Sequence, residues 1–224
     1  MTASISIILP VLNEPGLNQL LPRIHEAMKD TPENYEILIV KGDRETKFYS
    51  HNAHPRQREI KTYGDSLERS ILNGFSQATG GKIIIMDADG SHPPETLPKF
   101  IRALDSVEMA IGTRFIEGSH FKASIPRRIV TWGCVWLAHL SGSQLSDPMS
   151  GFFGVRKEAV DRIKFKPFPW KTALEIELMA KPSLKEIPIH FEERTIGRSK
   201  TSVWVGMRII LGLLGLIVYR RLKR

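Results

Sequence analysis

The residues best suited to chemistry are two aspartates, Asp87 and Asp89, which follow a short apolar run at residues 82–86. Glycines stand on both sides of this run, which predicts a buried strand inside an α/β sheet. Open α/β sheets bind ligands at the carboxyl ends of their strands. Because alternate residues of an extended chain point the same way, both carboxylates can reach one Mg²⁺ or Mn²⁺ ion that also binds the phosphates of a substrate. The spacing alone fits an exposed Asp-rich turn equally well.

Alternating strand and helix patterns surround these aspartates and would position them. Apolar runs predict strands at residues 4–10, 35–40, 82–86, 107–112 and 184–191. Apolar residues at helical spacing predict helices at residues 16–30, 67–78, 97–104 and 172–179. This alternation predicts a largely parallel sheet with right-handed crossovers in the first half of the chain.

Residues 44–63 interrupt the alternation. They are polar and basic and lack apolar periodicity, so we expect a surface loop. His51 and His54 stand three residues apart in it, a spacing that fits a metal site. Without a third ligand nearby, a solvated loop is the preferred interpretation.

Length and charge limit the classes of protein that fit. The chain has 224 residues, a net charge of +8 and one cysteine, Cys134. This length accommodates one well-buried α/β domain with an appendage. The charge fits a negatively charged partner, which includes nucleic acid, an anionic membrane and a phosphorylated substrate. One cysteine excludes an internal disulfide, and residues 1–4 lead straight into an expected strand, so we expect a reducing compartment and no signal peptide.

Five motifs occur in a fixed order along residues 4–200. They are residues 6–14 (SIILPVLNE), 86–95 (MDADGSHPPE), 112–115 (GTRF), 147–153 (DPMSGFF) and 197–200 (GRSK). With this set the chain resembles the family 2 glycosyltransferases, and within them the dolichyl-phosphate mannose synthases and related polyprenyl-phosphate sugar transferases. The resemblance implies an α/β fold of the GT-A type, with a Rossmann-like nucleotide-binding half and a mostly parallel sheet.

The resemblance implies a donor site for a nucleotide diphosphate sugar. Its residues would be Pro10, Leu12, Glu14, Asp43, Asp87, Ala88 and Asp89. Asp87 and Asp89 would share a Mg²⁺ or Mn²⁺ ion with the diphosphate. Members of the family often have an aromatic residue at the position of Leu12 and a pair of acids at Lys41-Gly42, so base stacking and the identity of the base stay open.

The resemblance also implies a site for an acceptor phosphate. Arg114 and one or both of Arg127 and Arg128 would hold it, because guanidinium groups bind phosphate oxygens with paired donors. Asp147 would place the sugar or the acceptor without acting as a base, since a phosphate is already an oxyanion. The catalytic residues would be Asp89, Arg114, Asp147 and Lys200, with Lys200 neutralising the leaving group. A solvated basic rim and a plain linker are the alternative interpretations of the arginines and of Lys200.

The carboxyl-terminal segment has the composition of a membrane-associated helix. Residues 203–219 are mostly aliphatic, with Trp204 and Tyr219 near the ends and a basic tail after them. As a helix the segment would be about 25 Å long, shorter than the roughly 30 Å hydrocarbon core of a bilayer. We therefore expect a helix in the membrane interface, with a spanning helix and packing against another helix as alternatives. The expected domains are residues 1–200 for the GT-A domain and residues 201–224 for this helix.

The resemblance, together with these features, implies an inverting, metal-dependent transferase that moves a sugar, with mannose from GDP-mannose favoured, onto dolichyl or another polyprenyl phosphate. It would act at the cytoplasmic face of a membrane. One alternative is transfer to a hydroxyl group of a glycan or lipid, with Asp147, Glu175 or Glu177 as the base. Another is a basic module that binds a membrane surface without catalysis. Basic residues scattered among acids, with few aromatics, argue against nucleic acid as the partner.

Overall fold

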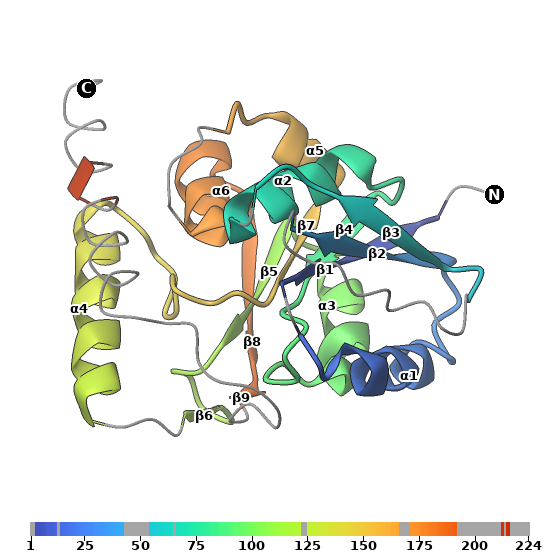
Figure 1. Cartoon of the computed structure of the whole chain (residues 1–224). Helices are drawn as coiled ribbons and strands as arrows, with labels where there is room; N and C mark the ends of the chain where they lie inside the picture. Colours follow the sequence, from blue (N-terminus) through green and yellow to red (C-terminus); the bar gives the residue numbers. More distant parts are fainter. Residues whose placement is uncertain are drawn as a thin grey trace.

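The computed structural model describes residues 3–12, 14–42, 54–64, 66–121, 125–165 and 171–191, together with residues 212, 214 and 215. Its core is a seven-stranded sheet in the order β3-β2-β1-β4-β7-β5-β8 (Figure 1). The strands are β1 (Ile5–Val11), β2 (Tyr35–Lys41), β3 (Gln57–Lys61), β4 (Lys82–Ile85), β5 (Met109–Thr113), β7 (Phe153–Arg156) and β8 (Leu184–Pro188). A separate two-stranded sheet joins β6 (His120–Phe121) to β9 (His190–Phe191).

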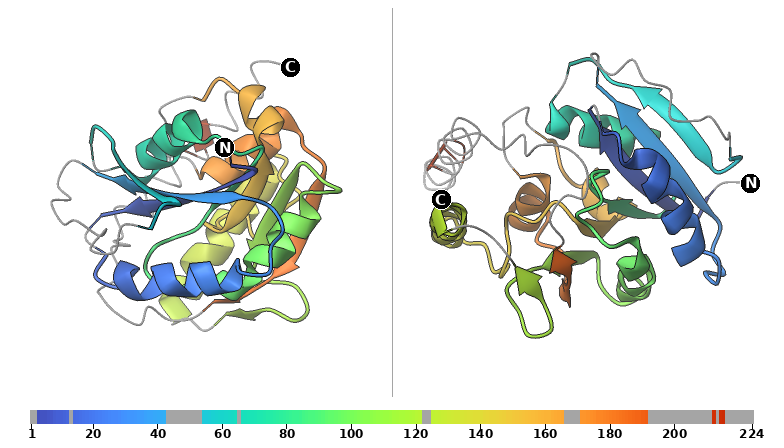
Figure 2. Two further views of the ribbon diagram at one scale, coloured as in Figure 1. Left: turned by 90° about the vertical axis from the view of Figure 1, so that its right-hand side faces the viewer. Right: turned by 60° about the horizontal axis from the view of Figure 1, so that its bottom comes forward.

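Helices cover both faces of the large sheet (Figure 1). The helices are α1 (Leu17–Ala27), α2 (Leu67–Gln77), α3 (Leu97–Ala103), α4 (Ile125–Leu140), α5 (Lys157–Asp161) and α6 (Thr172–Ala180), with a short 3-10 turn at Pro94–Thr96. Helices α1 and α3 bury their apolar residues against one face, and α2, α5 and α6 against the other. Helix α4 stands at the side of the molecule next to α6 (Figure 2).

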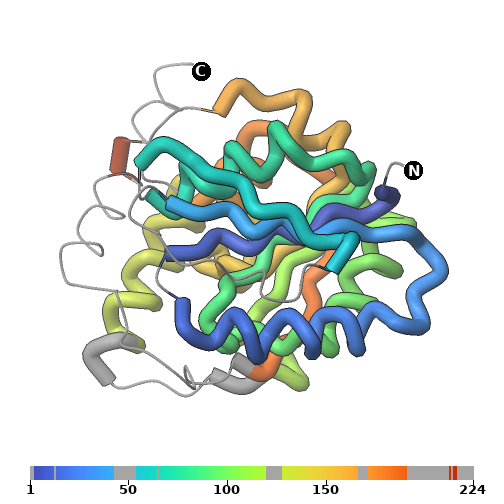
Figure 3. The backbone as a smooth tube through the Cα atoms, turned by 45° about the vertical axis from the view of Figure 1, so that its right-hand side comes forward, coloured from blue at the N-terminus to red at the C-terminus, as the bar shows by residue number. Residues whose placement is uncertain are grey.

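The strands of the large sheet do not all run in the same direction. Neighbouring strands run parallel except where β7 lies between β4 and β5 and runs antiparallel to both. The sheet is therefore mixed and mostly parallel, as the alternation of strands and helices predicted. Figure 3 shows β1, β2 and β3 running next to one another on one side of the sheet.

Strong local signals mark the elements that the sequence predicted correctly. Strands β1, β2 and β4 are mostly apolar and are buried almost throughout. Helix α2 begins where the Ser66 hydroxyl caps the N–H of Arg69, and it buries Ile71 and Phe75 one turn apart. Pro188 ends β8, so the predicted strand over residues 184–191 is divided into β8 and β9.

The loop predicted over residues 44–63 is wrong for residues 57–61, which form β3 parallel to β2. The only apolar side chain of β3 is Ile60, so this strand shows no apolar alternation. Two ion pairs attach β3 to β2 instead. Lys41 Nζ lies 3.0 Å from Glu59 Oε2, and Arg58 Nη2 lies 2.8 Å from Glu36 Oε2. Charge pairing with β2 thus replaces the hydrophobic pattern that identifies most strands.

Two other predictions concern segments that the structure describes only in part. His51 lies outside the described residues, so the structure does not test whether His51 and His54 could share a metal ion. Of the carboxyl-terminal segment, only residues 212, 214 and 215 are described, and they are helical. Within the described part of the chain, none of the helices has the length and apolar character needed to cross a bilayer.

Glu36 connects three strands to the turn before β4. One of its oxygens accepts hydrogen bonds from the Ser6 hydroxyl at 2.7 Å and from the N–H and hydroxyl of Thr79 at 2.8 and 2.7 Å. Arg58 binds the other oxygen. Burial acts to raise the pKa of Glu36, but these hydrogen bonds outweigh it and bring the pKa below the usual 4.5.

Replacing Glu36 by Gln should lower the free energy of unfolding at pH 7 by about 1–3 kcal/mol, because the buried Ser6 hydroxyl and the donors of Thr79 and Arg58 lose a charged acceptor. The folded-state pKa lies below 4.5, so this contribution is present above pH 4.5 and is lost as the pH falls through the folded-state value. Urea unfolding should therefore show a difference between the two proteins that shrinks on acidification. The exposed Glu26→Gln serves as a control, and equal unfolding free energies of wild type and Glu36→Gln at pH 7 would contradict this account.

Candidate active site

The ends of β4 and β5 and the start of β7 meet at one edge of the sheet. Phe153, the first residue of β7, pairs with Ile85 of β4 and with Ile111 of β5. Adjacent strands lie about 4.8 Å apart, so the chains leaving β4 and β5 are separated by about 10 Å at this edge. Asp87 and Arg114 lie just beyond these paired positions and are brought into the same region.

The loop after β4 holds its two aspartates differently. The Asp87 side chain is 35% exposed, whereas Asp89 is only 5% exposed. One oxygen of Asp89 accepts hydrogen bonds from the N–H of Ser91 at 2.9 Å and from its hydroxyl at 2.6 Å. Gly90 between these residues has a φ of +79°, which residues with a side chain rarely adopt. This tight turn keeps Asp89 inside while Asp87 reaches solvent.

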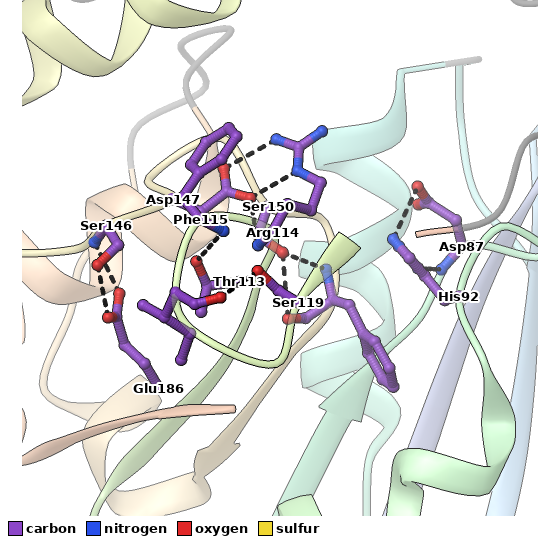
Figure 4. Close-up of polar contacts among 12 residues, drawn as sticks. Asp87, His92, Thr113, Arg114, Phe115, Ser119, Ser146, Asp147, Ser150 and Glu186 are labelled. Carbon is purple, nitrogen blue, oxygen red and sulfur yellow. Dashed lines mark hydrogen bonds and ion pairs between the residues drawn. The ribbon is translucent and has the colours of Figure 1, made fainter. Parts of the chain in front are cut away.

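His92 supports Asp87 from the interior (Figure 4). The N–H of Asp87 donates to His92 Nδ1 at 3.0 Å, which places the ring proton on Nε2, 3.9 Å from Asp87 Oδ2. Burial lowers the pKa of His92 below its usual 6.5, so the ring is neutral at pH 7. The ring also stacks on Phe152, with the centroids 5.0 Å apart. His92 therefore orients the loop without adding charge.

Gly151 brings the segment before β7 against Asp87. A Cβ atom at this position would lie 3.2 Å from Asp87 Oδ2, closer than most side chains tolerate. The glycine in the 147–153 motif thus allows the two segments to approach each other. It links the motif after β4 to the motif that contains Asp147.

Arg114 and Asp147 form a buried ion pair at the end of β5 (Figure 4). Arg114 Nε donates to Asp147 Oδ2 at 2.6 Å, and its Nη2 donates to Oδ1 at 2.8 Å. Asp147 is fully buried, and the Arg114 side chain is 10% exposed. Because one guanidinium engages both carboxylate oxygens, Asp147 is suited to orienting Arg114 and poorly placed to remove a proton from a substrate.

Two more acids hold the segment that leads to Asp147. Glu186 of β8 accepts hydrogen bonds from the N–H and hydroxyl of Ser146 at 2.6 and 2.7 Å (Figure 4). Glu177 of α6 accepts them from the Ser143 hydroxyl at 2.5 Å and the Gln144 N–H at 2.6 Å. Burial raises the pKa of Glu177 above its usual 4.5, against the effect of these bonds. Both glutamates anchor the loop, a role that the sequence did not indicate.

Charged groups of both signs surround His92. Besides burial, its pKa responds to the charges of Asp87, Asp89, Arg114 and Lys171. The two acids and the arginine predicted from separate motifs therefore share one electrostatic environment. Lys171, directly before α6, is a cation of this site that sequence reasoning missed, because it belongs to none of the five motifs.

The remaining predicted residues fall at the same edge or outside the described chain. Val11 pairs with Lys41 at the ends of β1 and β2, and β1 also runs parallel to β4. This edge includes Pro10, Leu12, Glu14 and Ala88, with Glu14 9% and Ala88 2% exposed. Asp43, Lys200 and the side chain of Arg127 lie outside the described residues. Arg128 is exposed near the start of α4.

Asp87 and Asp89 supply the oxygen ligands that Mg²⁺ and Mn²⁺ prefer. In the part of the chain that the structure describes, no three His, Cys, Asp or Glu side chains gather into a metal site. Two carboxylates leave the other coordination positions of such an ion to water and to the phosphates of a substrate.

Comparison with known families classifies the chain. The profile of "Glycosyl transferase family 2" matches residues 6–164, from β1 beyond α5. The chain belongs to this family. Membership confirms the resemblance drawn from the motifs, and the matched region contains Asp87, Asp89, Arg114 and Asp147.

Individual relatives of this glycosyltransferase carry one recurring name. The chain is 31% identical over 208 residues to the dolichol-phosphate mannosyltransferase of Pyrococcus furiosus, covering 88% of this chain and 58% of that protein. It is 29% identical over 241 residues to the protein of the same name from Saccharomyces cerevisiae, covering 98% and 89%. The chain thus spans little more than half the length of the first relative and most of the second.

A solved structure shares the fold. It is glucosyl-3-phosphoglycerate synthase from Mycobacterium tuberculosis in complex with Mn²⁺, UDP-glucose and phosphoglyceric acid. The similarity covers 96% of this chain and 80% of that chain, with a TM-score of 0.69 and 15% sequence identity. The described part of the chain therefore has a GT-A-like α/β fold.

Replacing Asp147 by Asn should lower the free energy of unfolding by about 3 kcal/mol, because it leaves the buried guanidinium of Arg114 without its counter-charge. Urea unfolding of the two proteins measures the difference. Asp161→Asn is the control, since Asp161 is 60% exposed and its pair with Lys157 should contribute less than about 0.5 kcal/mol. Equal losses in the two variants would show that the Arg114–Asp147 pair does not have this structural weight.

Proposed function

We propose that the chain is an inverting, metal-dependent glycosyltransferase that moves a sugar from a nucleotide diphosphate sugar, with GDP-mannose favoured, to dolichyl or another polyprenyl phosphate. The observation that carries the proposal is the shared sheet edge. Asp87 and Asp89 follow β4, the Arg114–Asp147 pair lies at the end of β5, and only β7 lies between these two strands. A donor diphosphate and an acceptor phosphate can lie side by side there. The name shared by the two relatives, dolichol-phosphate mannosyltransferase, supports the same reaction.

The donor would lie along the ends of β1, β2 and β4. Pro10, Leu12, Glu14 and Ala88 would line the nucleotide and sugar, with Asp43 as a further contact. Asp87 and Asp89 would hold Mg²⁺ or Mn²⁺, and the Mn²⁺ and UDP-glucose of the M. tuberculosis structure support this type of donor complex in the same fold. The bound ion would stabilise the negative charge that develops on the departing diphosphate.

The acceptor phosphate would lie at the end of β5. Asp147 engages one edge of the Arg114 guanidinium through Nε and Nη2, which fixes the plane of the group. Arg128 and Arg127 would supply further positive charge from the start of α4. Transfer to a hydroxyl group would need a base, but both oxygens of Asp147 bind Arg114, and Glu177 anchors the loop. Glu175, the third acid named for this role, is buried in α6. These contacts favour an acceptor that is already an anion.

The reaction would be a single in-line displacement. An oxygen of the acceptor phosphate forms the new bond to the anomeric carbon from the face opposite the nucleoside diphosphate. The bond between that carbon and the diphosphate oxygen breaks, and its electron pair leaves with the diphosphate. Lys200 would neutralise this charge, and the configuration at the anomeric carbon inverts. The reaction would take place at the cytoplasmic face of a membrane, with residues 201–224 as the associated helix.

Donor and metal should bind together. GDP-mannose with Mn²⁺ should raise the melting temperature more than either ligand alone. The total stabilisation by the two together should be about 2.7 kcal/mol at a ligand concentration of 100 times Kd. Asp87→Asn should lose the part that depends on Mn²⁺. Asp105→Asn should keep it, because Asp105 is exposed and pairs with Lys82 away from this edge. A shift that is equal with and without Mn²⁺, for every nucleotide sugar tried, would count against the proposed metal site.

Transfer should be detectable directly. Incubation with labelled GDP-mannose, Mn²⁺ and polyprenyl phosphate should give a lipid-extractable product that mild acid cleaves. Arg128→Gln should raise KM for the polyprenyl phosphate about tenfold, which corresponds to the loss of one charge-assisted hydrogen bond. Arg102→Gln, a change at an exposed arginine of α3, is the control. No product from any nucleotide sugar would refute the proposed reaction.

A further inference from the structure

Helix α4 turns an apolar stripe outward. Its inner side contributes Cys134 and Ala138 to a buried cluster with Leu174 and Leu178 of α6. The α4 stripe, between 51% and 68% exposed at each position, consists of Ile129, Val130, Trp132, Trp136 and Leu140. Four of its members follow one another at intervals of three or four residues and so share one helix face. Contiguous exposed apolar surface of this kind marks a site of interaction.

The α4 stripe begins next to the active site. The ring of Trp132 stacks on Phe115, with the centroids 4.9 Å apart. Phe115 follows Arg114, whose guanidinium carbon lies 5.3 Å from the centre of the Phe115 ring. One aromatic ring therefore separates the stripe from the arginine that would receive the acceptor phosphate. A molecule with an anionic head and an apolar body matches this succession.

Charge and residue type identify the partner as a membrane. The sequence of α4, IPRRIVTWGCVWLAHL, contains two arginines and no acid. Exposed Arg128 precedes the stripe, where its guanidinium suits the phosphates of anionic lipids. Tryptophan is the side chain best suited to the boundary between headgroups and acyl chains, and the stripe has two.

We propose that the α4 stripe docks the catalytic domain on an anionic lipid bilayer, with Trp132 and Trp136 at the acyl boundary and Arg128 at the level of the lipid phosphates, where the phosphate of a lipid acceptor would also lie. This contact is additional to any made by residues 201–224. It would let an acceptor phosphate reach Arg114 without leaving the membrane surface. The identity of that acceptor rests on the proposed function, whereas docking does not.

Tryptophan fluorescence tests the docking in the full chain. Trp170→Phe with Trp204→Phe leaves Trp132 and Trp136 as the only tryptophans. We expect vesicles of equal parts phosphatidylcholine and phosphatidylglycerol with brominated acyl chains to quench this emission. Vesicles of brominated phosphatidylcholine alone should quench the emission less. The assay contains no nucleotide sugar or polyprenyl phosphate, so failure of transfer and failure of docking are seen separately.

In the same background, Ile129→Gln with Trp136→Gln should weaken binding to the vesicles. The lipid concentration that gives half of the maximal quenching of Trp132 should rise roughly tenfold. The matched control is Tyr63→Gln with Leu67→Gln, two exposed apolar residues away from α4, which should behave like the parent. Sedimentation with vesicles but without quenching would assign membrane binding to another segment and overturn the proposal. Dimerisation that buries Trp132 and Trp136, shown by sedimentation equilibrium, would overturn it in favour of a second copy.

Discussion

The reversed direction of β7 is the constraint on which the site depends. Because β7 enters the sheet at the edge where β4 and β5 end, the segment before it must cross that edge between them. The crossing brings Asp147 to Arg114 and Gly151 to Asp87. If β7 ran parallel to its neighbours, this segment would lie at the opposite edge, far from both.

Most of the acids discussed here organise the chain around this crossing. Glu177 and Glu186 hold the loop before Asp147, whereas Glu36 joins β1, β2 and β3 at the opposite edge, where these strands begin. Asp147 then fixes the plane of the Arg114 guanidinium. A buried ion pair contributes little net stability compared with apolar packing, but it defines one orientation of its partners. The more exposed Asp87 is the acid best placed to meet a ligand, and in the proposed reaction it binds the metal ion together with Asp89.

The sequence predicts the elements that have strong local signals and misses those that depend on distant partners. Apolar runs were enough to predict β1, β2 and β4, and apolar residues at helical spacing were enough for α2, whereas β3 depends on charge pairs with Lys41 and Glu36. The motifs placed Arg114 and Asp147 in one site, but their direct bond links residues 33 positions apart and follows from the direction of β7. Lys171 and the anchoring roles of Glu177 and Glu186 carry no local pattern at all. Exposure of one face of α4 likewise appears only once the packing of α6 against its other face is known.

The central claim is that Asp87 and Asp89 hold a divalent ion in common with the diphosphate of a sugar donor. Pulsed EPR of the protein with Mn²⁺ and GDP-mannose tests it most directly, because phosphorus nuclei bound to the ion through oxygen produce a resolved hyperfine coupling. The account predicts phosphorus couplings in the wild-type protein and their loss in Asp87→Asn at the same concentrations. Protein-bound Mn²⁺ without phosphorus coupling, or couplings that persist unchanged in Asp87→Asn, would contradict it.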